Sequence, residues 1–166
     1  MHDTIPVTDL TDKQRRSFSC GVVALDDYFK KFAKGNHVKN LGKTFVLPEE
    51  NDAVIGYYTI SMGSVDFLSL PQEFRERLPR YPIPIARIAR LAVNLKNQGQ
   101  GWGEFLLVDA LQRIREAASL VAAFGVVVDA KDEKAKAFYM KYGFTSFVDN
   151  TLCLFLPMSS IPKLTL

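Results

Sequence analysis

The segment 91–103 constrains the fold most, because an apolar stretch runs into a glycine-rich loop and the loop runs into an amphipathic helix. Its sequence is LAVNLKNQGQGWG, with glycines at 99, 101 and 103. Glycine tolerates positive φ and lets the backbone approach a ligand closely, so several N–H groups can point at one anion. The first turn of the following helix adds partial positive charge there. This segment predicts a strand–loop–helix unit that can bind a pyrophosphate.

The rest of the chain predicts a mixed α/β fold around this unit. Strands are expected at 43–47, 53–61, 85–93, 125–128 and 152–156, and helices at 24–33, 71–78, 102–119 and 133–142. The polar turn 48–52 makes the first two strands an antiparallel hairpin. The long helix has a core stripe of Leu107, Leu111, Ile114 and Ala118, and its polar residues are expected to face away from that stripe, at Asp109, Arg113 and Glu116.

Composition and length exclude several classes of protein. The 166 residues are 48% hydrophobic and 23% charged, which suits a folded core and not a disordered chain. Without repeats or linker-like stretches, we expect one domain over 1–166. The longest apolar run, 120–128, is too short to span a bilayer, and the N-terminus carries an acid where a signal peptide needs a basic region. We therefore expect a cytoplasmic protein with no membrane association.

The cysteine and charge patterns add two expectations. Cys20 and Cys153 form no CxxC motif and are expected to pack as small apolar residues, and no residue cluster has metal-ligand spacing. We therefore predict no metal. The net charge is only +3, but two segments contain no acid. Segment 30–43 carries Lys30, Lys31, Lys34, Lys39 and Lys43, and segment 77–103 carries Arg77, Arg80, Arg87, Arg90 and Lys96. They could form a surface for a polyanion, and ordinary solvated faces are the alternative.

The glycine loop does not fit two of the known phosphate-binding patterns. A Walker loop needs Lys-Ser/Thr after its last glycine, whereas Gly103 is followed by Glu-Phe, and the dinucleotide pattern lacks its third glycine. The remaining match, Gln98-x-x-Gly101-x-Gly103, resembles the acetyl-CoA signature of the GNAT acetyltransferase superfamily. The segment 137–144, AFYMKYGF, resembles the second signature of that superfamily. Together, in this order, the two signatures identify the chain as similar to GNAT acetyltransferases.

Several further blocks resemble one subgroup, the GNAT toxins of type II toxin–antitoxin modules, which acetylate the amino group of aminoacyl-tRNA. These blocks are 18–21, 25–28, 43–47, 56–61, 78–84 and 90–93. The resemblance implies the GNAT acyl-CoA N-acyltransferase fold, a central and mostly antiparallel sheet flanked by helices. It also implies acetyl-CoA as co-substrate and aminoacyl-tRNA as substrate. Members are often dimeric and are neutralised by a ribbon-helix-helix antitoxin, so both a homodimer and such a partner are expected by resemblance.

The resemblance also assigns roles to residues. The backbone of Leu91, Ala92 and Val93 would pair with the pantetheine, and one N–H there would polarise the thioester carbonyl. The pyrophosphate would bind the loop formed by Gln98, Gly99, Gln100, Gly101, Trp102 and Gly103. The lysines of 30–43, with Arg87 and Arg90, are the candidate tRNA contacts.

Tyr139 is the candidate general acid, because a phenol is protonated at pH 7 and can protonate a leaving thiolate. A tyrosine that merely packs is the alternative. Tyr142 is the rival, expected on the same helix face, and ranks lower because only Tyr139 has the signature's spacing to Phe144. The sequence shows no general base, since its two histidines, His2 and His37, are expected on the surface.

An absent base favours an α-amine over a lysine ε-amine as substrate, because an α-amino group has a pKa of about 7.7–8.0 and is partly neutral at pH 7. Two other functions stay open from the residues alone. One is acetylation of a small-molecule or peptide amine, and the other is a catalytically silent CoA-binding or interaction module.

Overall fold

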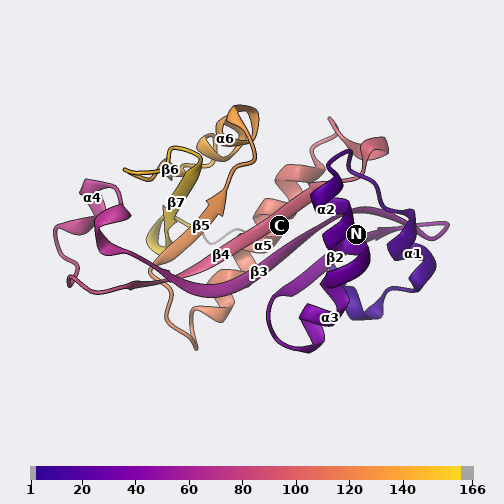
Figure 1. Cartoon of the computed structure of the whole chain (residues 1–166), viewed down its shortest axis with the longest axis horizontal. Helices are drawn as coiled ribbons and strands as arrows, with labels where there is room; N and C mark the ends of the chain where they lie inside the picture. The colour runs from indigo at the N-terminus through magenta and orange to yellow at the C-terminus, as the bar shows by residue number, and fades with distance from the viewer. Residues whose placement is uncertain (1–2, 162–166) are drawn as a thin grey trace. The chain divides into compact units, whose positions relative to one another are not determined.

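The computed structural model, shown in Figure 1, describes residues 3–161. These residues form two compact units. Unit 1 comprises residues 3–61 and 89–110, and unit 2 comprises residues 62–88 and 111–161. The prediction that 1–166 form one domain stays a prediction.

The strands form a seven-stranded mixed sheet in the order β1-β2-β3-β4-β5-β7-β6. Strands β4 and β5 are parallel, and the pairs β1–β2, β2–β3, β5–β7 and β6–β7 are antiparallel. The mixed α/β prediction is confirmed, including the hairpin of the first two long strands. The bounds are β1 (Ile5–Pro6), β2 (Lys43–Glu49), β3 (Ala53–Val65), β4 (Ile83–Val93), β5 (Gly125–Asp129), β6 (Thr145–Ser146) and β7 (Cys153–Pro157).

Six α-helices lie in the described part of the chain. They are α1 (Asp12–Ser17), α2 (Val23–Asp27), α3 (Ala33–Val38), α4 (Gln72–Arg75), α5 (Trp102–Ala117) and α6 (Glu133–Met140). Helix α1 was not predicted, although its capping box between Thr11 and Gln14 is a local signal that could have found it. Within residues 3–161, no helix is long and apolar enough to cross a membrane.

The core of unit 1 is built on aromatic side chains that the β2–β3 hairpin and the α2–α3 region bury together. Phe29 stacks on Tyr57 with ring centroids 4.6 Å apart, and Phe18 packs against both rings. The helix expected at 24–33 is not continuous, because Tyr28–Phe32 form a π-helical turn between α2 and α3. The Tyr57 hydroxyl donates a 2.7 Å hydrogen bond to the carbonyl oxygen of Leu25, which lies just before this turn.

Helix α5 follows the predicted stripe, and one residue expected on its other face, Asp109, is bonded to other parts of the protein. Leu107, Leu111 and Ile114 are buried, as expected. Asp109 was expected to face away from this stripe, and its side chain is half-buried and hydrogen-bonded within the protein. Its Oδ2 accepts hydrogen bonds from the Tyr58 hydroxyl at 2.6 Å and from the Thr4 hydroxyl at 2.7 Å. This carboxylate therefore ties α5 to β3 within unit 1.

Unit 2 is organised by β5 and β7, which lie side by side (Figure 1). Their residues are almost all buried. A Cβ at Gly125 would meet the Phe155 ring at 2.4 Å and the Leu156 carbonyl at 2.5 Å, so only glycine lets the two strands approach here. Helix α6 begins after Asp132, whose carboxylate accepts from the Ala135 N–H, and the chain leaves it through Gly143 at φ +93°. The predicted helix end at this glycine is confirmed to within two residues.

Candidate active site

The candidate donor-binding loop belongs to unit 1 and starts from an anchored asparagine. Asn94 follows β4, and its backbone N–H donates to the Ile55 carbonyl at 2.7 Å, while its side chain donates to the Val54 carbonyl at 3.1 Å. Its Oδ1 accepts from the Lys96 N–H at 3.2 Å. Asn94 is 8% exposed. The residue therefore fixes the end of β4 and the start of the loop to β3, a role that the sequence did not reveal.

Gln98 closes the same loop from its other end. Its Nε2 donates to the Val93 carbonyl at 2.9 Å and to the Cys20 carbonyl at 3.0 Å. The Gln98 side chain is therefore engaged with the protein, which leaves the loop backbone as the part that can receive a ligand.

The glycines of the loop are needed for their backbone angles. Gly99 has φ +76° and Gly101 has φ +87°, which side-chain-bearing residues rarely adopt. No heavy atom lies within 4 Å of a Cβ placed at either position, so crowding is not the reason for glycine. Trp102 begins the 16-residue helix α5 directly after the loop. A loop of this form at a helix N-terminus suits an anionic group.

The strand before the loop is packed closely on one side. A Cβ at Gly56 of β3 would lie 2.6 Å from the Ala92 carbonyl oxygen, so β3 approaches β4 more closely than a side chain would allow. The register of β4 with β5 ends at Ile88↔Val128, whereas β4 continues to Val93. The predicted pantetheine-pairing residues 91–93 therefore lie in the part of β4 that follows its pairing with β5.

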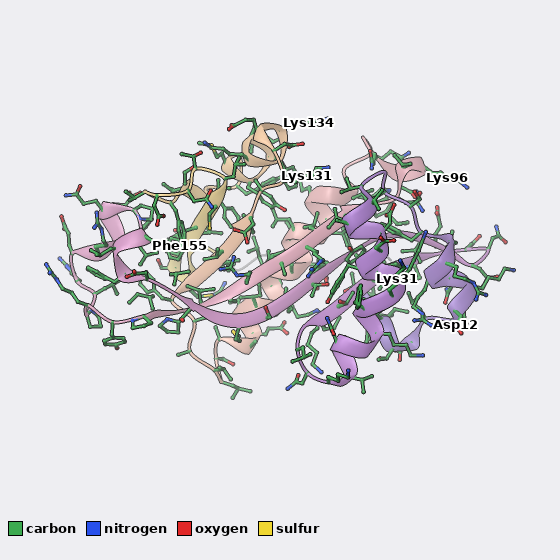
Figure 2. All side chains as sticks on the ribbon, viewed as in Figure 1. Asp12, Lys31, Lys96, Lys131, Lys134 and Phe155 are labelled. Carbon is green, nitrogen blue, oxygen red and sulfur yellow. The ribbon has the colours of Figure 1, made fainter. Side chains whose placement is uncertain are left out.

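Tyr139 belongs to unit 2 and lies in α6, between the rings of Phe138 and Phe144. It is 8% exposed, and this burial, with a smaller contribution from the Asp129 carboxylate, raises the pKa of Tyr139 to about 12. The phenol is therefore neutral at physiological pH, as a proton donor must be. Figure 2 shows Lys131 and Lys134 around the start of the same helix. Tyr142 lies beyond the end of α6 at Met140, in the following turn, and not on the helix face where it was expected.

A charged pair that the sequence did not predict lies on the sheet of unit 2. Arg87 pairs with Val127 in the β4–β5 register, which places Asp129 on the same face as a diagonal neighbour. The Arg87 Nη1 donates to Asp129 Oδ2 at 2.6 Å. Cys153 is the direct β7 partner of Asp129, and burial, followed by the Asp129 charge, raises the pKa of its thiol to about 12. Both cysteines are buried, as predicted.

The basic residues predicted to contact tRNA do not share one environment. Arg87 is paired with Asp129, and Arg90 places its guanidinium 3.6 Å from the centre of the Tyr28 ring. The two arginines are three residues apart on one strand, so their side chains leave opposite faces. Lys31 lies 3.7 Å from Asp27, and Lys43 donates to the His37 carbonyl at 3.2 Å. Lys34 and Lys39 are exposed, and Lys30 is half-buried. One common tRNA surface stays a prediction.

His37, the histidine that the structure describes, uses its acceptor nitrogen within the fold. The Nδ1 of His37 accepts from the Thr44 N–H at 3.0 Å. Burial, followed by the charge of Lys43, lowers the pKa of His37. His37 is half-buried and not fully on the surface, and His2 lies outside the described residues. Across 3–161, no group of three or more His, Cys, Asp or Glu side chains could hold a metal ion.

Comparison with known proteins shows relatives along nearly the whole chain. The chain is 37% identical to a tRNA-acetylating toxin of Mycobacterium tuberculosis over 142 residues, which is 86% of this chain and 84% of the relative. It is 32% identical to the probable toxin TacT of Sinorhizobium fredii over 159 residues, which is 90% and 88% of the two chains.

Solved structures are also similar to this chain along nearly its whole length. AtaT complexed with acetyl-methionyl-tRNAfMet matches with a TM-score of 0.88 at 30% identity, over 97% of both chains. AtaTR bound with acetyl-CoA matches with a TM-score of 0.81 at 30% identity, over 97% of this chain and 95% of that one. The predicted GNAT fold is confirmed. Residues 9–159 match the acetyltransferase (GNAT) domain family, and the chain therefore belongs to that family and is an N-acetyltransferase.

Proposed function

We propose that this protein is a toxin that transfers the acetyl group of acetyl-CoA to the α-amino group of aminoacyl-tRNA and so stops translation. The observation that supports aminoacyl-tRNA as the substrate is the 37% identity, over 86% of the chain, to a protein named for tRNA acetylation. A structural neighbour covering 97% of this chain holds acetyl-methionyl-tRNA, and another holds acetyl-CoA. An acetylated α-amine cannot form a peptide bond as acceptor, which accounts for toxicity.

Unit 1 supplies the residues that would hold the donor. The N–H groups of residues 98–103 receive the pyrophosphate, because Gly99 and Gly101 adopt positive φ at the N-terminus of α5. Asn94 and Gln98 hold this loop in its shape before any ligand arrives. The backbone of Leu91, Ala92 and Val93 pairs with the pantetheine, and one of its N–H groups polarises the thioester carbonyl.

Unit 2 supplies the proton donor. The amine nitrogen attacks the thioester carbonyl carbon, the C–S bond breaks, and the Tyr139 phenol gives its proton to the departing sulfur. Burial raises the pKa of Tyr139 to about 12, so the phenol carries this proton at neutral pH.

For the tRNA we propose the lysines around the π-helical turn and α3. Lys30, Lys31, Lys34 and Lys39 fall within ten residues of unit 1, and three of them are exposed (Figure 2 labels Lys31). Phosphate contacts of this kind position a nucleic acid without reading its sequence. Arg90 supports this surface indirectly, since its guanidinium packs on Tyr28 of the π-helical turn.

We also propose a cytoplasmic location, where aminoacyl-tRNA is used, a homodimer, and a ribbon-helix-helix antitoxin as partner. Two structural neighbours support an antitoxin as partner. One is AtaT bound to the C-terminus of the antitoxin AtaR, at 28% identity and a TM-score of 0.80, and the other is the KacTA–DNA complex, at 29% and 0.78. Each covers at least 96% of this chain.

The test is a transfer assay with purified protein and labelled acetyl-CoA. Total aminoacyl-tRNA should accept the label, whereas the same tRNA after removal of its amino acids should not. If free amino acids or peptide lysines accept the label and aminoacyl-tRNA does not, the protein is a small-molecule or peptide acetyltransferase and not a tRNA-acetylating toxin. Acetyl-CoA binding without transfer to any of these acceptors would indicate the silent module.

A further inference from the structure

The Asp129 carboxylate is a charged group beside the candidate acid that the mechanism above does not use. It stands at the end of β5, two residues after Val127, and its side chain is 55% exposed. Its neighbours are Arg87 from β4, at 2.6 Å, and the Cys153 thiol from β7. From α6, Tyr139 lies close enough for the carboxylate to raise its pKa.

The Arg87 guanidinium positions the Asp129 carboxylate while leaving it open to a ligand. Arg87 is 31% exposed and donates to one oxygen only, Oδ2, so the guanidinium holds the carboxylate in place without covering it. Two exposed ions on a surface would stabilise the fold by only about 0–1 kcal/mol, which is a weak structural reason to place this pair next to a buried phenol. The exposed part of the carboxylate can bind a cation.

We propose that Asp129 is a catalytic residue that binds the α-amine of the substrate and accepts its proton, with Arg87 as the positioning residue. This inference rests on the proposed function, because it takes the acceptor to be an α-amine. Below its pKa of about 7.7–8.0 that amine is an ammonium, which forms a charge-assisted hydrogen bond with a carboxylate. The sequence alone indicated no general base, because neither of its histidines adjoins a signature motif. The structure supplies a candidate, the Asp129 carboxylate.

The protons balance as follows. The bound ammonium first releases one proton to water by way of the exposed Asp129 carboxylate. The neutral amine nitrogen then bonds to the thioester carbonyl carbon while a second N–H proton passes to the Asp129 carboxylate. The C–S bond then breaks and its electron pair leaves with sulfur, which takes the proton of the Tyr139 phenol. The Asp129 carboxyl returns its proton to the Tyr139 phenolate. The products are the N-acetylated amine, the free thiol and the one proton released to water, and both side chains end as they began. The neutral Cys153 thiol takes no part.

The test compares acetylation of aminoacyl-tRNA by wild type and Asp129→Asn at pH 7 and pH 9. At pH 7 the variant should lose about 10²-fold in rate, at the lower end of the range for a positioned acid or base. At pH 9 the amine arrives neutral and hydroxide can take the proton, so the loss should shrink to under about tenfold. Acetyl-CoA affinity, measured by calorimetry, should match wild type and shows that the variant is folded. Glu116→Gln removes an exposed carboxylate of α5 and is the matched control, with wild-type rates at both pH values.

Arg87 provides a second, independent variant. Arg87→Met should show the same pH-dependent loss of rate, and Arg87→Lys should recover part of that rate. The double variant Arg87→Met with Asp129→Asn should be no slower than Asp129→Asn alone, because both changes disrupt the same ion pair. An unchanged rate in Asp129→Asn, or a loss of equal size at both pH values, would overturn the inference. If wild type itself acetylates no aminoacyl-tRNA, the proposed function fails first, and the two failures are thereby distinguished.

Discussion

Gln98 donates its side-chain amide to the carbonyl oxygen of Val93 at 2.9 Å, which closes the glycine loop onto the end of the strand that precedes it. The same nitrogen also reaches the Cys20 carbonyl at 3.0 Å. The glutamine of the acetyl-CoA signature therefore acts through the shape of the loop, and its own side chain is already occupied.

Gln98→Ala should consequently weaken acetyl-CoA binding more than it weakens the fold. Losing two hydrogen bonds to partly exposed carbonyls should lower the free energy of unfolding by roughly 1–2 kcal/mol. The loosened loop should lower acetyl-CoA affinity by about tenfold or more, which calorimetry measures. Gln100→Ala is the control, because the Gln100 amide makes only a long contact of 3.4 Å to the Lys96 carbonyl. Equal affinities in the two variants would contradict this role for Gln98.

Gly101→Val should damage donor binding through the backbone. There is room for the added Cβ, but a β-branched residue at φ +87° is strained by about 1–2 kcal/mol or more, so the loop is expected to change conformation. Acetyl-CoA affinity should fall at least about tenfold while circular dichroism and thermal unfolding change little. Gly35→Val is the comparison, since Gly35 lies in α3 with open space around it and no positive φ. Wild-type affinity in the Gly101 variant would make the loop a plain turn.

Binding to tRNA should depend on salt in the manner of phosphate contacts. The logarithm of the affinity should fall linearly with the logarithm of salt concentration, because each neutralised phosphate releases condensed counterions. Lys34→Glu should flatten this slope by about 1 and leave acetyl-CoA affinity unchanged. Lys13→Glu serves as the control, because Lys13 is paired with Asp52 at 3.1 Å and lies outside the proposed surface. A flat salt response in wild type would favour a small-molecule amine as substrate.

A substitution at Arg87 distinguishes its two possible roles, positioning Asp129 and contacting a tRNA phosphate. The structure pairs it with Asp129, so Arg87→Met should slow the reaction without changing the salt slope of tRNA binding. If Arg87 instead contacts a phosphate, as the sequence suggested, the slope should fall by about 1.

The buried phenol of Tyr139 should make the free energy of unfolding fall at alkaline pH. Because the folded pKa of Tyr139 is raised from about 10 to about 12, its contribution is fully present below pH 10 and is lost as the pH rises toward 12. Between pH 9 and pH 11 wild type should lose roughly 1–2 kcal/mol of unfolding free energy through this group. Tyr139→Phe, which cannot ionise, should show a correspondingly shallower decline in denaturant titrations at those two pH values. Equal declines would mean that the phenol is not held neutral by its surroundings.

The sequence identified the parts of the molecule whose chemistry demands particular residues close together in the chain. The glycine loop, the buried strands and the end of α6 at Gly143 are of this kind, because turn, burial and helix-ending requirements act on neighbouring residues. Asp129 was missed because its partner Arg87 is 42 residues away, and only the β4–β5 register places them on one face.

Two other differences have the same origin in tertiary contacts. Asp109 has the spacing of a solvent-facing helix residue, but Tyr58 and Thr4, which bond to it, are 51 and 105 residues away. The π-helical turn at Tyr28–Phe32 interrupts a segment whose local pattern predicted a regular helix. The hydrogen bond from Tyr57 to Leu25 comes from a strand 32 residues further on, and helix periodicity carries no information about it.

The most direct measurement of the central claim is the rate of aminoacyl-tRNA acetylation by Tyr139→Phe beside Tyr142→Phe. Removing one oxygen from Tyr139 keeps the ring between Phe138 and Phe144, so stability and acetyl-CoA affinity should stay near wild type while turnover falls by about 10²–10⁴. Tyr142→Phe should keep most of the activity, and on expression it should arrest growth whereas Tyr139→Phe should not. An active Tyr139→Phe with an inactive Tyr142→Phe would move the acid to Tyr142, and full activity in both would mean that no tyrosine protonates the leaving thiolate.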